Sequence, residues 1–218
     1  MQHLKKQARN FRGLAREYGQ WRTIRDCSSV DCQGNPVPWY TYPTTEFLSH
    51  LDLAGFNIIE YGSGNSTLWW AGRAKQVTSV EHDETWHNRV KNKSLSNPCK
   101  ISYKLAKEPS VYCSFAANEH DIVIVDGKYR RECIEHLHKI SWGGVMLILD
   151  NSDWYPQSVR FIQDNCHWIQ IDFHGFGPIN DYTWTTSIFI NPTRSNELRY
   201  TMRLKSKLGL VQVASGDY

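Results

Sequence analysis

Short apolar runs alternate with longer segments of helical periodicity through the middle of the chain. The runs are rich in Val, Ile and Leu, or alternate apolar with polar residues, which is typical of β-strands. In the segments between them, apolar residues recur every three or four positions, the spacing of one helix face. Strands that alternate with helices predict an α/β domain with a parallel sheet. The predicted strands are residues 56–60, 76–81, 100–105, 121–125 and 145–149.

The pattern changes after the fifth strand. A helix is expected over residues 154–165, and two further β-rich runs, 168–173 and 183–190, follow it. A loop rich in Gly and Asn joins these two runs, so we expect them to close the sheet as an antiparallel pair. Residues 106–119 show no clear periodicity and are expected to be irregular.

Aromatic residues are concentrated just before the first predicted strand, in the run Trp-Tyr-Thr-Tyr that starts at Trp39. A short helix is expected there, capped by Thr44 or Thr45. The segment before the first strand can lie over a ligand, so Tyr40, Tyr42 and Thr44 are candidates to line a pocket. The alternative for Trp39 and Tyr42 is that they pack beneath the helix.

The N-terminal region predicts a mostly helical segment over residues 3–25. Phe11, Leu14, Tyr18 and Trp21 recur at three- and four-residue spacing, which places them on one face. An apolar helix face normally packs against a core, and we expect that here.

Three parts are expected along the chain: a basic helical segment and loop (1–38), one α/β domain (39–192) and a basic extension (193–218). The basic ends are explained most simply as solvated surface; the alternative is docking to an acidic carrier or anionic substrate. The basic residues are Lys5, Lys6, Arg9, Arg12, Arg16, Arg22 and Arg25 at one end, and Arg194, Arg199, Arg203, Lys205 and Lys207 at the other.

Composition is that of an ordinary globular protein, with 40% hydrophobic and 22% charged residues. A net charge of +3 is too small to predict binding to nucleic acid. No apolar run approaches the roughly 18 residues of a membrane span. The N-terminus also lacks the apolar region of a signal peptide, so we expect a cytoplasmic protein whose six cysteines are reduced.

The most informative stretch is a glycine turn between two acids. The first predicted strand ends in Glu60, with Gly62 and Gly64 directly after it, and the second ends in Glu81. Glycines let a ligand approach the backbone, and an acid at the end of the second strand is where a ribose diol is bound. A nucleotide-sized pocket is therefore predicted. The dinucleotide fingerprint places a third glycine at residue 67, where this chain has Thr67.

Further polar residues follow the fourth and fifth predicted strands. Asp126 comes after the fourth, and Asp150 and Asn151 come after the fifth. In a parallel sheet, ligands bind beyond the carboxyl ends of the strands. Buried acids are unfavourable unless they are paired or ligated, so their concentration at one edge predicts a functional site.

The run from Glu60 to Ser66 resembles motif I of class I S-adenosylmethionine-dependent methyltransferases, roughly (D/E)-x-G-x-G-x-(G/S), and Glu81 resembles the acid of their motif II. The resemblance is to a group of small bacterial-type members. It implies a Rossmann-like α/β fold with a seven-stranded, mostly parallel sheet, an antiparallel last strand and helices on both faces. The resemblance spans about residues 36–190 and includes 38–43, 60–70, 80–83, 126–130 and 150–154.

This resemblance implies S-adenosylmethionine as the cofactor. Glu60 would order the loop and the methionine amino group, Gly62 and Gly64 would line the ligand, and Glu81 would hold the ribose hydroxyls. The residues implied to bind the cofactor are Glu60, Gly62, Ser63, Gly64, Ser66, Glu81, His82 and Asp126.

Asp126, Asp150 and Asn151 are also similar to the metal triad of catechol O-methyltransferase and its relatives, which implies a Mg²⁺ site. Hard oxygen ligands suit Mg²⁺, and a metal-bound hydroxyl loses its proton more readily. Asp126 and Lys128 are the implied catalytic residues, although Lys128 lies two residues after Asp126 and the relatives' lysine lies three. The alternatives are that Asp126 bonds the cofactor or substrate, and that Asn151 or Ser152 caps the next helix.

The predicted function is methyl transfer to a hydroxyl oxygen of a small molecule or glycan. One alternative is an NAD-dependent oxidoreductase on the same kind of sheet, which Thr67 argues against. The other is a non-catalytic relative that binds a partner through its basic ends. The acceptor and the oligomeric state do not follow from the sequence.

Overall fold

A computed structural model describes residues 2–93, 100–116 and 118–201. Its centre is a seven-stranded sheet with the strand order β3-β2-β1-β4-β5-β7-β6. The strands are β1 Asn57–Tyr61, β2 Gln76–Glu81, β3 Ile101–Leu105, β4 Ile122–Val125, β5 Met146–Leu149, β6 Ile169–Gly175 and β7 Trp184–Ile190.

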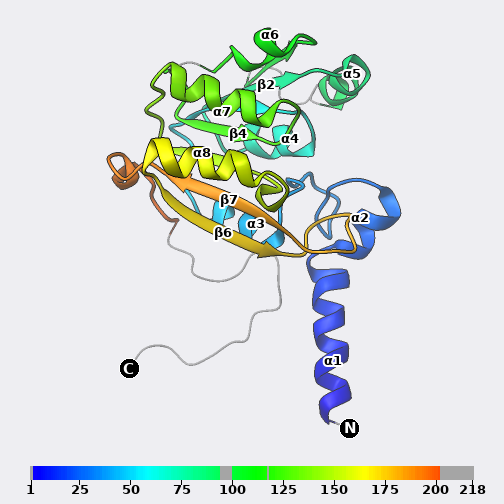
Figure 1. Cartoon of the computed structure of the whole chain (residues 1–218). Helices are drawn as coiled ribbons and strands as arrows, with labels where there is room; N and C mark the ends of the chain where they lie inside the picture. The colour runs from blue at the N-terminus through cyan, green and yellow to red at the C-terminus, as the bar shows by residue number, and fades with distance from the viewer. Residues whose placement is uncertain (1, 94–99, 117, 202–218) are drawn as a thin grey trace.

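The helices that connect the strands cover both faces of the sheet (Figure 1). On one side lie α7 and α8, and on the other lie α3 and α4. The α-helices are α1 Gln2–Arg12, α2 Gln20–Asp26, α3 Tyr42–Ser49, α4 Asn65–Ala71, α5 Glu84–Lys93, α6 Pro109–Cys113, α7 Arg130–Lys139 and α8 Pro156–Cys166. A π-helical turn (Gly13–Glu17) and two 3₁₀ turns (Ser152–Trp154 and Ser195–Glu197) complete the set.

Strand directions confirm the predicted fold class. β1 to β5 pair in parallel, and β7 runs antiparallel to both of its neighbours, β5 and β6. The chain moves outward from β1 through β2 to β3 and then returns to place β4 on the other side of β1. The strand order therefore reverses between β1 and β4, which is where open parallel sheets bind their ligands.

Two apolar cores lie on the two faces of the sheet, and β4 contributes to both. Ile122 and Ile124 join one core with Trp70 of α4, while Val123 and Val125 join the other with Leu137 of α7. Successive side chains of a strand point to opposite faces, so a strand that is buried on both sides must be apolar throughout. This explains the continuous apolar run in the sequence.

The N-terminal helix differs from the prediction. α1 has no buried residue and projects from the domain (Figure 1). Phe11 is 65% exposed and Trp21 is 58% exposed, and their rings contact each other with centroids 6.1 Å apart. The predicted core packing of this apolar face is wrong in α1, because its contacts are with the Gly13–Glu17 turn and Trp21 of α2, and none of its residues is buried.

Beyond α1, the N-terminal segment is attached to the domain through the loop between β6 and β7. Gln20 donates from Nε2 to the Asn180 carbonyl at 3.1 Å, and Ile179 N–H donates to the Thr23 hydroxyl at 2.8 Å. The helix α2 is therefore anchored to the α/β domain through Gln20 and Thr23.

Three local expectations also need correction. β1 begins and ends one residue later than predicted, so Glu60 lies inside the strand. α3 begins at Tyr42 after Thr41, because Pro43 is tolerated in the first turn of a helix. The region 106–119 contains the short helix α6, which also has a proline in its first turn.

The C-terminal extension is described only as far as residue 201, and Arg203, Lys205 and Lys207 lie outside the described residues. Arg194 is not a free basic side chain, since it donates to Asp121 at 3.0 Å and to Glu197 at 2.8 Å. Within the described residues, no helix combines the length and apolar character that a bilayer span requires.

Ile124→Ala tests the two-faced sheet. Ile124 is fully buried in β4, so its loss should lower the free energy of unfolding by about 2–5 kcal/mol through lost burial and a residual cavity. Ile169→Ala is the matched control, because Ile169 is 52% exposed on the edge strand β6, and it should lower stability by less than about 1 kcal/mol. Equal losses in urea denaturation would contradict the burial pattern.

Candidate functional site

Three adjoining cavities follow the carboxyl ends of the parallel strands, and Ser63 and Asp126 line all of them. The large cavity has a volume of about 680 Å³, the narrow cavity about 110 Å³ and the aromatic cavity about 350 Å³. They form one cleft at the point where the strand order reverses.

Most of the predicted cofactor-binding residues lie together on the wall of the large cavity. The ends of β1, β2 and β4 meet there because the three strands are parallel neighbours. Gly64 lines the narrow cavity instead, and Asp150 and Asn151 line the aromatic cavity. The predicted residues on the large cavity are Gly62, Ser63, Ser66, Glu81, His82, Asp126 and Lys128.

The glycine turn brings two loops into backbone contact. Gly62 has a φ of 103°, and a Cβ there would lie 3.0 Å from the backbone nitrogen of Gly127. A Cβ on Gly127 would lie 2.8 Å from the nitrogen of Gly62. Gly64 is different, since its φ of −174° is extended and a Cβ would make only ordinary contacts. Gly62 and Gly127 are therefore required by the fold itself.

Glu81 is held rigidly at the wall of the large cavity. Its Oε2 accepts from the Ser63 N–H at 3.0 Å, and its Oε1 accepts from the N–H groups of His82 at 2.8 Å and Asp83 at 3.0 Å. Three backbone donors stabilise the buried carboxylate and fix its orientation. The predicted position of Glu81 beside the glycine turn is confirmed, while its contact with a ligand stays a prediction.

Glu60 lies behind the turn and not on the cleft surface. It is 1% exposed, and its Oε2 accepts from the Thr67 hydroxyl at 2.5 Å. Thr67 in turn accepts from the Gly64 N–H at 3.1 Å, so the two side chains hold the loop in shape. These two hydrogen bonds of the Thr67 hydroxyl explain why a threonine stands where a dinucleotide-binding fold has glycine. The other carboxyl oxygen of Glu60 has no hydrogen-bond partner within the described part of the chain.

Burial raises the pKa of Glu60 to about 7 from its ordinary value of 4.5. The hydroxyl groups of Ser66 and Thr67 lower the pKa, and the charge of Glu81 raises it further. The protonated form is therefore favoured in the folded state at mildly acidic pH.

Trp86 of α5 is a site residue that the sequence analysis missed. Its indole N–H donates to the Ser63 carbonyl, and its ring lines both the large and the narrow cavity. The guanidinium of Arg89 lies 5.0 Å from the ring centroid. Helical periodicity places Trp86 on α5 but does not indicate that it reaches back to the glycine turn.

The N-terminal segment covers one side of the cleft. Asn65 donates from Nδ2 to the Ser28 hydroxyl at 3.1 Å and to the Ser29 carbonyl at 2.6 Å. Cys27, Ser28 and Ser29 line the narrow cavity together with Trp39. This segment is therefore part of the site, which its sequence did not indicate.

Arg130 ties the ends of β4 and β5 together. The Arg130 side chain is 9% exposed. Its guanidinium donates to the carbonyl groups of Gly127 at 3.0 Å and of Asp150. It also donates to the carbonyl of Asp126 at 3.0 Å and to the Oδ1 atom of Asp126 at 3.2 Å. The ring of Tyr155 lies 4.7 Å from the guanidinium carbon. The guanidinium therefore compensates the charge of the acids on this rim.

The acids at the ends of β4 and β5, Asp126 and Asp150, both have raised pKa values. Burial raises the pKa of Asp126 well above its ordinary value, and the charge of Asp150 adds to the shift. Burial also raises the pKa of Asp150, to about 6, while the Thr186 hydroxyl and the Trp184 indole, both bonded to its Oδ1, lower it. The pair therefore titrates above the ordinary range of aspartate.

The rim does not fit the predicted Mg²⁺ site. The guanidinium of Arg130 already lies beside Asp126, and Asp150 Oδ1 accepts two hydrogen bonds. Asn151 has a φ of 51° and begins the turn Ser152–Trp154. The sequence does not indicate that the Arg130 side chain folds back onto Asp126, and this contact is what distinguishes the rim from the predicted triad.

The pocket-lining aromatics are not those predicted. Tyr40 and Thr44 are fully buried and Tyr42 is 4% exposed, so all three pack inside the domain. Trp39 lines both the narrow and the aromatic cavity. Trp39 and Tyr40 lie in a bend, and packing against the domain decides which of them faces the cleft.

Glu60→Gln tests the environment of the buried acid. The folded state binds the proton of Glu60 more tightly than the unfolded state, so Glu60 lowers the free energy of unfolding as the pH rises from about 4.5 to about 7. The stability of the variant relative to the native protein should rise across this window by about 3 kcal/mol. Glu108→Gln, at an exposed position, is the matched control for the substitution in the same pH-dependent urea denaturation. A pH-independent difference for Glu60→Gln would refute the assignment.

No protein-family model and no curated protein matches the chain. The fold is similar to that of the O-methyltransferase TomG from Streptomyces achromogenes in complex with SAM (TM-score 0.52, 13% identity, 69% of this chain and 77% of that one). It is also similar to the N-methyltransferase NodS from Bradyrhizobium japonicum in complex with S-adenosyl-L-homocysteine (TM-score 0.51, 15% identity, 69% and 84%).

A third solved structure extends the likeness to another kind of methyltransferase. This is the precorrin-6y C5,15-methyltransferase from Geobacter metallireducens (TM-score 0.51, 10% identity, 63% of this chain and 80% of that one). The three structures differ in what their names say they methylate, and what they share with this chain is the arrangement of the sheet. This chain therefore has the Rossmann-like fold of class I S-adenosylmethionine-dependent methyltransferases.

Proposed function

We propose that the protein is an S-adenosylmethionine-dependent methyltransferase that methylates a hydroxyl oxygen of a small molecule or glycan. The observation that carries the proposal is the large cavity, which brings the Gly62 turn, Glu81 and Asp126 onto one wall. Its volume of about 680 Å³ lies within the usual range for a small-molecule site.

The residues of the large cavity fit the methyl donor. Glu81 presents a carboxylate fixed by three backbone donors, which suits the two hydroxyls of a ribose. Gly62 allows the ligand to approach the backbone, and the Trp86 ring offers an apolar surface at the same wall. Glu60 acts through the loop that Thr67 holds. When bound, S-adenosylmethionine would supply a methyl group from its sulfonium. The methyl group would be transferred to the acceptor, and the electron pair of the carbon–sulfur bond would remain on sulfur.

We assign to Asp126 the action on the acceptor. It lines both the large and the aromatic cavity, and its side chain is 22% exposed. In its ionised form it can take the proton of a hydroxyl whose oxygen forms the new bond to carbon. Lys128, the second predicted catalytic residue, lines only the large cavity and is exposed, so we assign proton removal to Asp126. The proposal contains no metal, because Arg130 already balances the acids.

The first test is binding of the methyl donor. S-adenosylmethionine should bind in isothermal titration, and Glu81→Gln should weaken binding at least about tenfold by removing charge from the ribose contact, about 1.4 kcal/mol. Glu84→Gln is the matched control, since Glu84 is exposed on α5 and pairs with Lys107 outside the cavity. Thermal melting should show that both variants are folded. No binding of the donor at millimolar concentration would remove the proposal.

The second test is transfer of the methyl group. Sugars, phenols and small acids are incubated with S-adenosylmethionine carrying a labelled methyl group. For the acceptor found, Asp126→Asn should lower kcat by roughly 10²- to 10⁴-fold, as expected for loss of a general base. The native rate should rise with pH as the Asp126–Asp150 pair ionises, because the pKa values of both are raised.

Asp164→Asn is the matched control for this test, because Asp164 is exposed on α8 away from the cleft. An unchanged kcat in Asp126→Asn would refute its role as the base. Donor binding without transfer to any acceptor would favour the non-catalytic alternative.

A further inference from the structure

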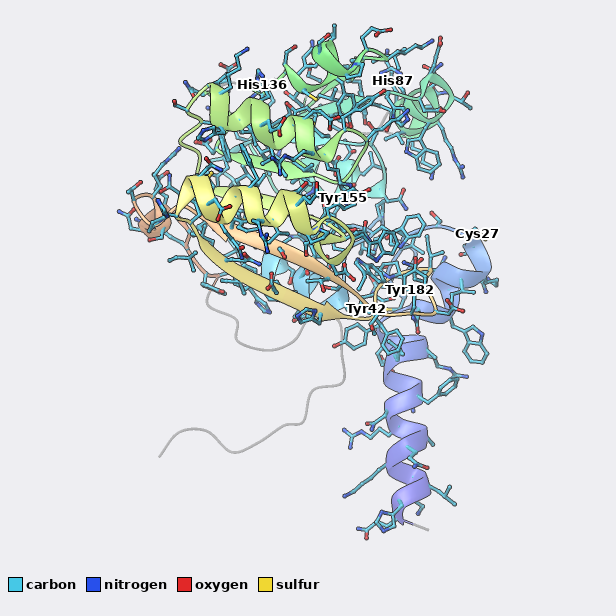
Figure 2. The ribbon with its side chains drawn as sticks, in the orientation of Figure 1. Cys27, Tyr42, His87, His136, Tyr155 and Tyr182 are labelled. Atoms are coloured by element: carbon cyan, nitrogen blue, oxygen red, sulfur yellow. The ribbon has the colours of Figure 1, made fainter. Side chains whose placement is uncertain are left out.

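The aromatic cavity combines three exposed aromatic rings from separate parts of the chain. Trp39 precedes α3, Trp154 lies in the turn before α8, and Tyr182 lies in the loop between β6 and β7 (Figure 2 labels Tyr182). Their exposed fractions are 44%, 56% and 45%. Large aromatic side chains that stay half-exposed around one hollow indicate a surface that a ligand covers.

Two of the three exposed rings lie next to each other. The ring centroids of Trp154 and Tyr182 are 6.2 Å apart with an interplanar angle of 34°, and the buried ring of Trp184 lies 6.1 Å from Tyr182 at an angle of 62°. The two exposed neighbouring rings, Trp154 and Tyr182, offer an apolar surface to one side of a flat or puckered ring. The volume of about 350 Å³ is at the small end for ligand sites, which suits a single ring unit.

Polar side chains alternate with the aromatic rings around the same hollow. Asp126, Asp150, Asn151 and Asn180 all line it, and they offer carboxyl and amide groups to several hydroxyls at once. A phenol has one or two hydroxyls on an otherwise apolar ring and would leave most of these groups without a partner. Buried polar groups left unpaired are unfavourable, so the lining matches a ring with many hydroxyls.

The charge of the cavity argues against an anionic acceptor. Arg130 is the cation that lines it among the described residues, and its guanidinium donates to Gly127, Asp126 and Asp150. It therefore has no free face with which to clamp a carboxylate or phosphate in two-point fashion. Two acids on the same lining would repel such a group.

We infer that the aromatic cavity binds a sugar residue as the methyl acceptor. One face of the sugar ring packs on Trp154 and Tyr182, and its hydroxyls bond to the acids and amides of the rim. Because Asp126 lines both this cavity and the large cavity, one hydroxyl of the sugar lies between Asp126 and the methyl donor. This inference rests on the proposed function and names its acceptor class.

The test is saturation-transfer NMR on the full chain with saturating S-adenosyl-L-homocysteine. The probes are methyl glycosides of common hexoses and 6-deoxyhexoses, with phenol and choline measured in parallel. At least one glycoside should receive saturation through its ring protons. Trp154→Ala should raise the dissociation constant of that glycoside at least tenfold, and Tyr182→Ala should also raise it.

Trp21→Ala is the matched control. Trp21 is 58% exposed, close to the 56% of Trp154, but it does not line the aromatic cavity. It should leave the affinity unchanged. Saturation of phenol or choline alone, no signal from any glycoside, or an unchanged affinity in Trp154→Ala would overturn the inference. Binding of S-adenosyl-L-homocysteine is measured in the same samples. If it binds and no glycoside does, this inference fails and the methyl-donor proposal stands; if it does not bind, both fail.

Discussion

The backbone contact between Gly62 and Gly127 is the constraint on which the cleft depends. These residues follow β1 and β4, the two strands between which the order of the sheet reverses. Their loops meet at a distance that leaves no room for a Cβ on either residue. A side chain there would separate the two strand ends and move Asp126 away from the Gly62 turn. The large cavity and the position of its acids therefore follow from two residues that contribute no side chain.

Charge on the rim is balanced by the protein itself. Glu81 is stabilised by three backbone donors, and the Asp126–Asp150 pair is stabilised by Arg130 and by the hydrogen bonds of Trp184 and Thr186. Burial still raises the pKa values of the two aspartates, so the folded state holds these groups at some expense of stability. Groups held in this way are typical of sites that must move a proton.

The walls of the cleft come from segments that are distant in the sequence. The N-terminal segment reaches Asn65 at the start of α4 and the loop that carries Asn180 and Tyr182. That loop joins β6 to the antiparallel strand β7, so the departure from a parallel sheet places it beside the cleft. The parts of the fold that depart from the repeat of strand and helix thus shape the aromatic cavity, while the repeat itself shapes the large cavity.

The sequence alone determined the sheet, the glycine turn and the acids at the strand ends. It could do so because a strand buried on both faces must be apolar, and because parallel strands bring the residues that follow them to one edge. Tertiary structure decided that Arg130 lies beside Asp126, that Trp39 and not Tyr40 faces the cleft, and that Phe11 stays exposed. Each of these depends on which distant element packs against the side chain, and local periodicity carries no information about that partner.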